Sequence, residues 1–420
     1  MSTAQQNKNL NRRIIFLLCL VFVCSIYTVG QTLEDSAHYS RPHIYQLGVE
    51  SRLGYIFPTN PFLAGENNKR ERIENTYSTH LKYSFQFRPY SYVNKIYRGV
   101  YQGVGVAHYR LGNKEEVGNP TAIYLFQGAT IAQLSRRISL NYEWNFGVSN
   151  GWKPYDHEFN SYNGMMGSKL NAYMNTNFYF KQQLSPQFDL IYGATLTHFS
   201  NGNTKFPNAG LNATDIKIGL TYNFNRESNN LSKALAARAL LIQKFPRHIS
   251  TDVVLFGSWR RKGVIFEETP MLSPERYSVF GFNINPMYNM NYNLRFGLSL
   301  DGVYDSSANV YTEEYIIGYG QTDPGYTFYK PSLKKQLALG VSIRGEYVMP
   351  YFTVGLGIGA NILHGGGNLN GLYQTLALKI EVTRSSFIHI GYNLQNFKEP
   401  NYLMLGVGYR FGNRYPCFYR

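Results

Sequence analysis

Hydrophobic and polar residues alternate along most of this chain with a period of two, the pattern of β-strands with one apolar and one polar face. The segment 137–148 is the most regular, with apolar residues at every even position and polar residues or glycine between them. In the first half the pattern predicts strands near 43–57, 77–88, 98–111, 120–133, 137–148, 169–183, 188–200 and 212–224. In the second half it predicts strands near 247–259, 277–288, 291–305, 334–347, 351–364, 371–383, 386–396 and 401–411.

The length of these strands separates two kinds of all-β protein. A soluble sandwich also alternates, but its strands are about 5–6 residues long. The predicted strands are closer to the 9–11 residues of a tilted transmembrane strand, and several end in Tyr, Phe or Trp, as at a membrane interface. We therefore expect an antiparallel transmembrane outer-membrane β-barrel. Inward-facing charges could pair inside it: Glu50 with Arg52, and Arg344 with Glu346.

Composition agrees with a barrel and opposes a helical membrane protein. The chain has 36 Tyr and 27 Phe but only 3 Trp. Its mean hydropathy of −0.31 suits strands that are apolar on one face only. Residues 1–30 have the features of a secretory signal peptide, because Arg12 and Arg13 precede the apolar run 14–29. Export combined with a barrel predicts the bacterial outer membrane.

The formal net charge of +15 narrows the choice of partners. Basic chains often bind nucleic acid, but here Lys and Arg are scattered and the protein is expected to be exported. We therefore expect no nucleic acid and a surface that meets anionic lipid headgroups. Only Cys417 remains after removal of the signal peptide, which argues against an intrachain disulfide or a thiolate metal cluster. The histidines show no metal-ligand spacing, so no metal or other cofactor is expected.

Loop lengths predict which end of the barrel faces outward. Connections near 58–76, 112–119, 150–168 and 201–211 are long, whereas those near 134–136 and 184–186 are short. Outer-membrane barrels have long outer loops and short periplasmic turns. The loop 201–211 is therefore expected at the outer surface, at the depth of the outer leaflet.

Candidate chemistry gathers beside this loop. His198 and Ser200 fall on the apolar face of the preceding strand, about 6.6 Å apart along it. Asn212 has the same parity on the following strand, fourteen residues after His198. Histidine can take the proton of a serine hydroxyl, and an amide oxygen can fix the tautomer of the histidine. Because the apolar face of a membrane barrel meets lipid, the pattern predicts an esterase that acts on lipid.

Loop residues complete this hypothesis. A tetrahedral intermediate needs hydrogen-bond donors for its oxyanion, and the candidates are the backbone N–H groups of Asn201 and Gly202 and the side-chain amide of Asn208. Lys205 could attract a lipid phosphate. Asp215 is excluded as the acid of a triad, because its parity points it into the barrel.

The motif H-F-S-N-G at 198–202, followed by P-N-A-G-L-N at 207–212, resembles the PagL-type lipid A 3-O-deacylases, an acyloxyacyl hydrolase-like family. The resemblance extends over most of 43–225 and includes 103–106, 118–124 and 167–173. It implies an eight-stranded outer-membrane barrel that hydrolyses an ester-linked acyl chain of lipid A. It also implies that His198 is the base and Ser200 the nucleophile, with Asn208 near the oxyanion. Asn212 stands where the best-known members carry Glu, which affects the expected rate rather than the reaction type.

Two alternatives stay open. The spacing H-x-S-N-G with Asn fourteen residues after the His also resembles outer-membrane phospholipase A, which implies a Ser-His-Asn site on a twelve-stranded barrel with calcium. A non-catalytic porin or adhesin barrel is the alternative from another class. The surrounding sequence favours the deacylase, with lipopolysaccharide of the outer leaflet as partner and a homodimer as one option for assembly.

The expected organisation has four parts: a signal peptide (1–30), a PagL-like barrel (31–225), a linker (226–246) and a second barrel region (247–420). The second region either closes its own eight-stranded barrel or joins one larger barrel. The linker contains a segment of helical composition, 231–241. Residues 359–366 weakly resemble 193–200, with Gly366 where the serine would stand.

Overall fold

The computed structural model describes residues 43–89, 91–156, 158–226, 244–260, 263–266, 269–272, 276–312, 328–397 and 399–415. Both barrels described below lie within one compact unit, Pro42–Arg420. The predicted signal peptide and the predicted helix at 231–241 lie outside the described residues.

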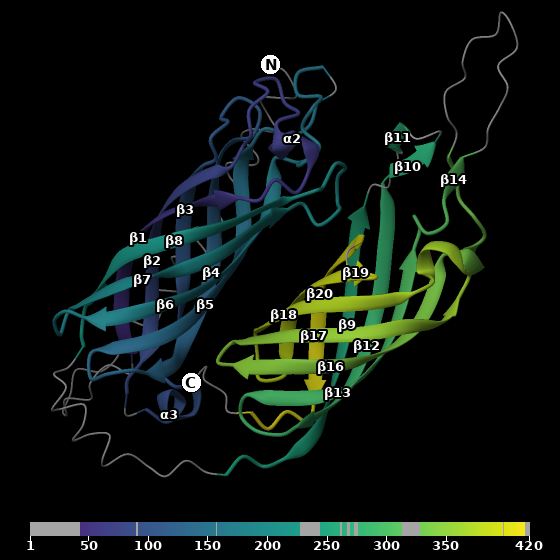
Figure 1. Ribbon diagram of the computed structural model, residues 1–420. Coiled ribbons are helices and arrows are strands. Elements are labelled where there is room, and N and C mark those ends of the chain that lie inside the picture. The colour runs from purple at the N-terminus through teal and green to yellow at the C-terminus, as the bar shows by residue number, and fades with distance from the viewer. Residues whose placement is uncertain are drawn as a thin grey trace, which may run out of the picture. The chain divides into compact units, whose positions relative to one another are not determined.

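The first half forms a closed antiparallel barrel of eight strands, labelled in Figure 1. Each strand pairs with its sequence neighbours, and β8 closes the barrel against β1. The strands are β1 (His43–Ile56), β2 (Asn75–Phe87), β3 (Tyr101–Arg110), β4 (Gly118–Gln133), β5 (Ile138–Trp152), β6 (Leu170–Gln183), β7 (Phe188–Ser200) and β8 (Leu211–Asn223). All eight lie within a few residues of the predicted strands.

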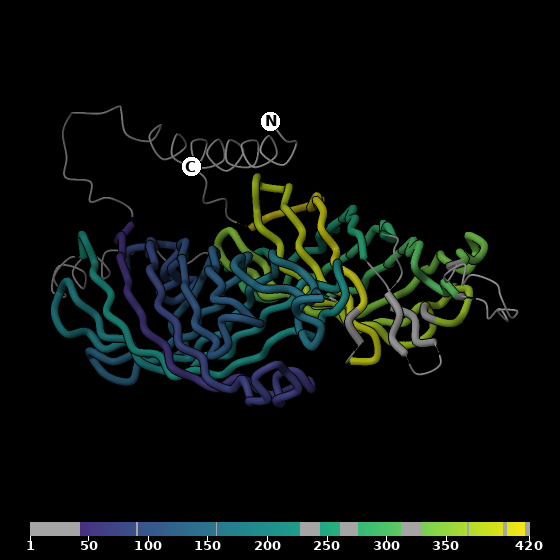
Figure 2. The backbone as a smooth tube through the Cα atoms, turned by 90° about the horizontal axis from the view of Figure 1, so that it is seen from above, coloured from purple at the N-terminus to yellow at the C-terminus, as the bar shows by residue number. Residues whose placement is uncertain are grey.

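The second half closes a barrel of its own, which decides between tandem barrels and one larger barrel. Figure 2 shows its strands in green to yellow and those of the first barrel in purple to teal. Its first strand, β9, pairs with the last, β20. The strands are β9 (His248–Arg260), β12 (Tyr277–Asn289), β13 (Leu294–Asp305), β16 (Leu337–Met349), β17 (Phe352–His364), β18 (Leu372–Glu381), β19 (Ser386–Gln395) and β20 (Glu399–Phe411).

The connections carry short elements that the alternation did not predict. They are the helices α2 (Pro61–Ala64) and α3 (Tyr92–Tyr97), the 3₁₀ turns η1 (Leu333–Lys335) and η2 (Gly367–Leu369), and the hairpins β10 (Gly263–Phe266) with β11 (Thr269–Leu272) and β14 (Tyr311–Thr312) with β15 (Phe328–Tyr329). Figure 1 shows α2 and α3 at opposite ends of the first barrel. Asn60 caps α2 by accepting from the Leu63 N–H, and Pro61 fits the first helical turn, where no N–H partner is needed.

The outer surfaces are apolar and the interiors are polar, as the alternation predicted. On β8, for example, Ile216 is 75 % exposed whereas its neighbours Asp215 and Lys217 are buried. Such a surface is stable only in hydrocarbon, and closed barrels leave no unpaired strand edge there. The protein is therefore an outer-membrane β-barrel protein. Among the described residues, no helix is long and apolar enough to cross a membrane.

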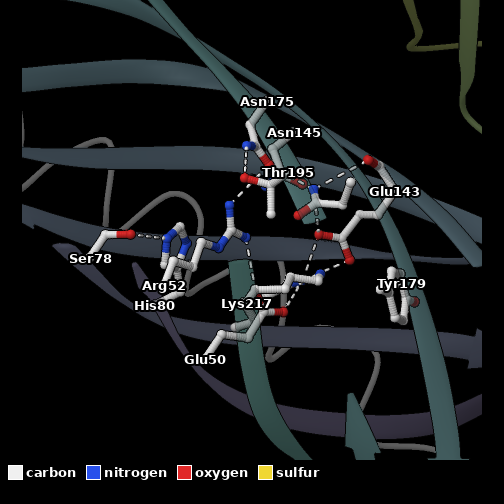
Figure 3. Close-up of polar contacts among 12 residues, drawn as sticks. Glu50, Arg52, Ser78, His80, Glu143, Asn145, Asn175, Tyr179, Thr195 and Lys217 are labelled. Atoms are coloured by element: carbon white, nitrogen blue, oxygen red, sulfur yellow. Dashed lines mark hydrogen bonds and ion pairs between the residues drawn. The ribbon is translucent and has the colours of Figure 1, made fainter. Parts of the chain in front are cut away.

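The interior of the first barrel is filled by a network of paired charges (Figure 3). Glu50 accepts from Arg52 at 2.9 Å and from Lys82 at 2.8 Å. Lys82 also donates to Glu143 at 2.6 Å, and Arg52 donates to Asn175 at 3.1 Å. The predicted pairing of Glu50 with Arg52 is thus confirmed. The cavity left beside these groups has a volume of about 30 Å³, room for only one or two water molecules.

The interior of the second barrel has a similar network with one difference from the prediction. Asp252 pairs with Arg295, Lys379 and Arg410. The predicted pair of Arg344 with Glu346 is wrong: Arg344 pairs with Asp301, and Glu346 pairs with Arg295 and Lys379. Arg344 and Glu346 share a face of one strand, but each meets charges of opposite sign on other strands of the closed barrel.

Candidate active site

The three predicted catalytic residues come from the facing ends of β7 and β8. These strands pair antiparallel, with His198 directly opposite Asn212 and Ser200 two residues further along β7. All three have outward parity, as does Leu196, which is 58 % exposed. The structure therefore brings His198, Ser200 and Asn212 together on the outside of the first barrel.

A short hydrogen bond joins the histidine to the asparagine. The distance from His198 Nδ1 to Asn212 Oδ1 is 2.7 Å. Because an amide oxygen only accepts, Nδ1 carries the proton and Nε2 is left as the acceptor. This is the tautomer in which a histidine can remove a proton from a neighbouring hydroxyl.

The serine lies against the same small residue as the histidine ring. A Cβ placed on Gly210 would be 3.3 Å from His198 Cε1 and 3.7 Å from the Ser200 Cβ, so both side chains flank this glycine. Gly210 has a φ of +73°, which other residues rarely adopt. In the described part of the chain, Ser200 Oγ forms no hydrogen bond with His198. Catalytic hydrogen bonds are often long before substrate binds.

The loop after β7 places the predicted oxyanion donors differently from the expectation. The Asn201 N–H donates to Asn208 Oδ1 at 2.8 Å, so this backbone N–H is already used within the loop. The expectation that Asn201 offers its N–H to an oxyanion is therefore not met in this conformation. The same bond fixes the Asn208 amide, and both Asn208 and Gly202 line a cavity together with His198 and Ser200.

Two glycines of the neighbouring loop are placed very differently, and only one supports this arrangement. A Cβ on Gly167 would collide with the Phe206 carbonyl oxygen, whereas one on Gly164 would meet nothing within 4 Å. The Met165 carbonyl also accepts from the Gly210 N–H at 3.0 Å. Gly167 therefore permits the close approach of the two loops that holds Phe206–Gly210 in place.

The remaining predicted residues lie at the edge of the site. Lys205 is exposed in the loop, and its carbonyl accepts from the Asn201 side chain at 2.6 Å. Asp215 is buried inside the barrel, where it accepts from Thr195 and Thr197. Its exclusion from the site on parity therefore agrees with the structure. No group of three potential metal-binding side chains occurs among the described residues.

The cavity beside the serine has a second wall that the sequence pattern did not suggest. Its volume is about 670 Å³, and it is lined on one side by β5–β7 and on the other by residues of β16–β20. Leu403 of β20 lies close to Gly202, because a Cβ on Gly202 would be 2.7 Å from Leu403 Cγ. A contact between residues two hundred positions apart leaves no local signal in the sequence.

The fold and these side chains define an outer-membrane protein of two barrels with a Ser, a His and an Asn gathered on the outside of one of them. Residues 249–414 match the family model described as "Acyloxyacyl hydrolase, C-terminal domain", so this part of the chain is similar to that domain. The match falls on the second barrel, whereas the motif that resembles the deacylases lies in the first. No curated protein matches the chain.

Solved structures similar to the chain are other outer-membrane barrels at low sequence identity. Neisserial surface protein A has 9 % identity and a TM-score of 0.28, covering 43 % of this chain and 97 % of its own. The outer membrane protein Omp33 of Acinetobacter baumannii has 9 % identity and a TM-score of 0.16, covering 88 % and 99 %. The barrel fold of this chain is established by its own strand pairing.

Proposed function

We propose that this protein is a serine esterase that hydrolyses an ester-linked acyl chain of lipid A in the outer leaflet, with Ser200 as nucleophile. The observation that carries the proposal is the constellation on the lipid-facing side of β7 and β8. There the 2.7 Å bond from His198 to Asn212 leaves Nε2 as a proton acceptor, and the His198 ring and Ser200 both flank Gly210. The description of the matched family, an acyloxyacyl hydrolase, supports ester hydrolysis.

In the proposed reaction, Ser200 Oγ attacks the acyl carbonyl carbon while His198 Nε2 takes the hydroxyl proton. We expect the Gly202 N–H and the Asn208 Nδ2 amide, from two residues that line the cavity, to donate to the developing oxyanion. The bond to the sugar oxygen then breaks, and this oxygen takes the proton from His198. Water, activated by the same histidine, releases the fatty acid from the serine. Asn212 stabilises the imidazolium in both steps.

The filled interiors favour this function over a porin. The cavities beside Glu50 in the first barrel and Asp301 in the second have volumes of about 30 and 20 Å³, which admit water but no larger solute. An expected homodimer stays a prediction.

Mass spectrometry of lipids from bacteria that express the chain tests the proposal. We expect lipid A to lose one acyl chain, and Ser200→Ala to abolish the loss. Ser51→Ala is the matched control, because Ser51 lies on β1, away from the site. Fatty acid released from phospholipids instead would support a phospholipase. Unchanged lipids of both kinds would contradict the esterase and favour a barrel without chemistry.

A further inference from the structure

The cavity at Ser200 is a long apolar groove between the two barrels. On the first barrel, Tyr142, Trp144 and Phe146 of β5 line it together with Met174 of β6. On the second barrel its wall comes from β18 and β19, with Leu376, Leu378, Ile390, Tyr392 and Leu394. Leu378 of β18 faces outward from its barrel yet is only 6 % exposed. On the neighbouring strand β17, the outward Leu356 is 63 % exposed. The second barrel thus covers this face of the first.

Contacts close the groove at both ends. At the outer end Gly202 lies against Leu403, and Asn203 Nδ2 donates to the Asn401 carbonyl at 3.1 Å. At the inner end the ring centroids of Trp144 and Phe352 are 5.1 Å apart, and Gln127 Nε2 donates to the Pro350 carbonyl at 2.8 Å. His198, Ser200 and Asn208 are polar groups at the outer end of a channel whose lining is mostly apolar.

The length of the groove fits one leaflet. Ser200 pairs with Ala172, which pairs with Val148, and the lining residue furthest along β5 is Tyr142. Six residues of strand span about 20 Å. A strand tilted by about 40° then descends about 15 Å, which is half of the hydrocarbon thickness of a bilayer. A saturated acyl chain whose ester sits at Ser200 would extend along the groove to about the middle of the membrane.

We propose that the second barrel forms half of the acyl-chain site: the groove between β5–β7 and β18–β20 binds the fatty-acyl chain whose ester Ser200 attacks, and its depth limits the chain length accepted. This inference rests on the proposed function and extends it by giving the second barrel a role. The occupant is the acyl chain because an apolar channel with a nucleophile at its outer end matches an ester that carries a hydrocarbon tail.

A series of tryptophan substitutions along the groove tests this depth limit. Strand register places Leu376 beside Tyr392, and Ile390 further from Ser200, beside Leu378. The full chain in phospholipid vesicles is treated with alkyl fluorophosphonates, which label reactive serines, carrying short and long alkyl chains. We expect Leu376→Trp to slow the long probe about tenfold or more relative to the short probe, as a lost methylene site does in an apolar pocket. Ile390→Trp should slow only the longest probes.

Matched variants separate this inference from the proposed function. Leu298 is an outward residue of β13 that is 63 % exposed and lies outside the groove. Leu298→Trp should therefore change neither the short-probe rate nor the long-probe rate. Leu376→Ala opens the groove and should speed the longest probes. Equal chain-length preference in all these variants, or equal loss of short and long labelling in Leu376→Trp, would overturn the groove. Labelling that survives Ser200→Ala would instead overturn the esterase itself.

Discussion

The two barrels of this protein have the same interior design and different exteriors. Inside, the first strand of each carries one acid that meets three cations: Glu50 in the first barrel and Asp252 in the second. Outside, β7 ends in His198 and Ser200, whereas its counterpart β19, the seventh strand of the second barrel, ends in Leu394 and Gln395. The comparison shows that paired interior charges occur in both barrels, whereas the residues of the proposed catalytic site occur at one strand end of the first barrel.

The weak likeness between 359–366 and 193–200 does not reflect equivalent places in the two barrels. His364 ends β17, the fifth strand of its barrel, whereas β7 is the seventh of the other. Gly366 stands where a serine would be needed. Short apolar runs with glycine recur in any barrel, so such likeness arises without common function.

The largest expected difference is in the rate of hydrolysis between variants of His198 and of His364. His198→Ala removes the proposed base and should slow hydrolysis roughly 10²–10⁴-fold, the usual contribution of general-base catalysis. His364→Ala should leave the rate unchanged, because no serine follows two residues later. The measurement is the rate of acyl release from purified lipid A. Equal losses of the acyl-release rate in both variants would contradict the proposal that only the first barrel carries the catalytic base.

The interior networks predict a pair of stability effects. Glu50→Gln and Asp252→Asn each remove an acid that three buried cations share, and breaking a buried ion pair typically costs about 3–5 kcal/mol. We expect both to lower the temperature of heat-induced unfolding, followed by gel mobility. Only Glu50→Gln should also lower labelling of Ser200 by the short probe, since its barrel carries His198, Ser200 and Asn212. Glu158→Gln, at an exposed loop position, is the control and should change neither quantity.

A smaller effect is expected at the residue that orients the base. Asn212→Ala removes the hydrogen bond to His198 Nδ1 and should lower kcat about tenfold. This change corresponds to a loss of about 1.4 kcal/mol of transition-state stabilisation. Asn212→Asp supplies a carboxylate that stabilises the imidazolium better and should raise kcat several-fold above the wild type. Identical kcat values in the three proteins would mean that Asn212 has no part in orienting the base.

The smallest effect should come from the loop contact. Gly167→Ala forces the loop around Phe206 to shift and should lower activity a few-fold, because Asn208 moves with it. Gly164→Ala is the matched control three residues away, where a Cβ meets open space. A steady-state assay on the same substrate distinguishes the two. Unchanged activity in Gly167→Ala would show that the loop tolerates the shift without displacing the amide.

The amino-acid sequence by itself determined the strands, their faces and the side on which the candidate site lies. Alternation with period two is a local property, so β7 and β8 and the outward parity of His198, Ser200 and Asn212 could be predicted residue by residue. The same parity correctly placed Asp215 in the interior. The assignment of the site to the outward-facing end of the barrel also used a local property, the loop lengths, and it stays a prediction.

Only the tertiary structure decided the features that depend on contacts between strands far apart in the sequence. The closure of β8 on β1 and of β20 on β9 fixes two barrels rather than one, and strand pairing is nearly equally favourable for many partners. The partner of Arg344, the use of the Asn201 N–H by Asn208, and the approach of Leu403 to the site all result from curvature and packing. These contacts join residues that no period along the chain relates, because their separation in space is set by closure of the whole barrel.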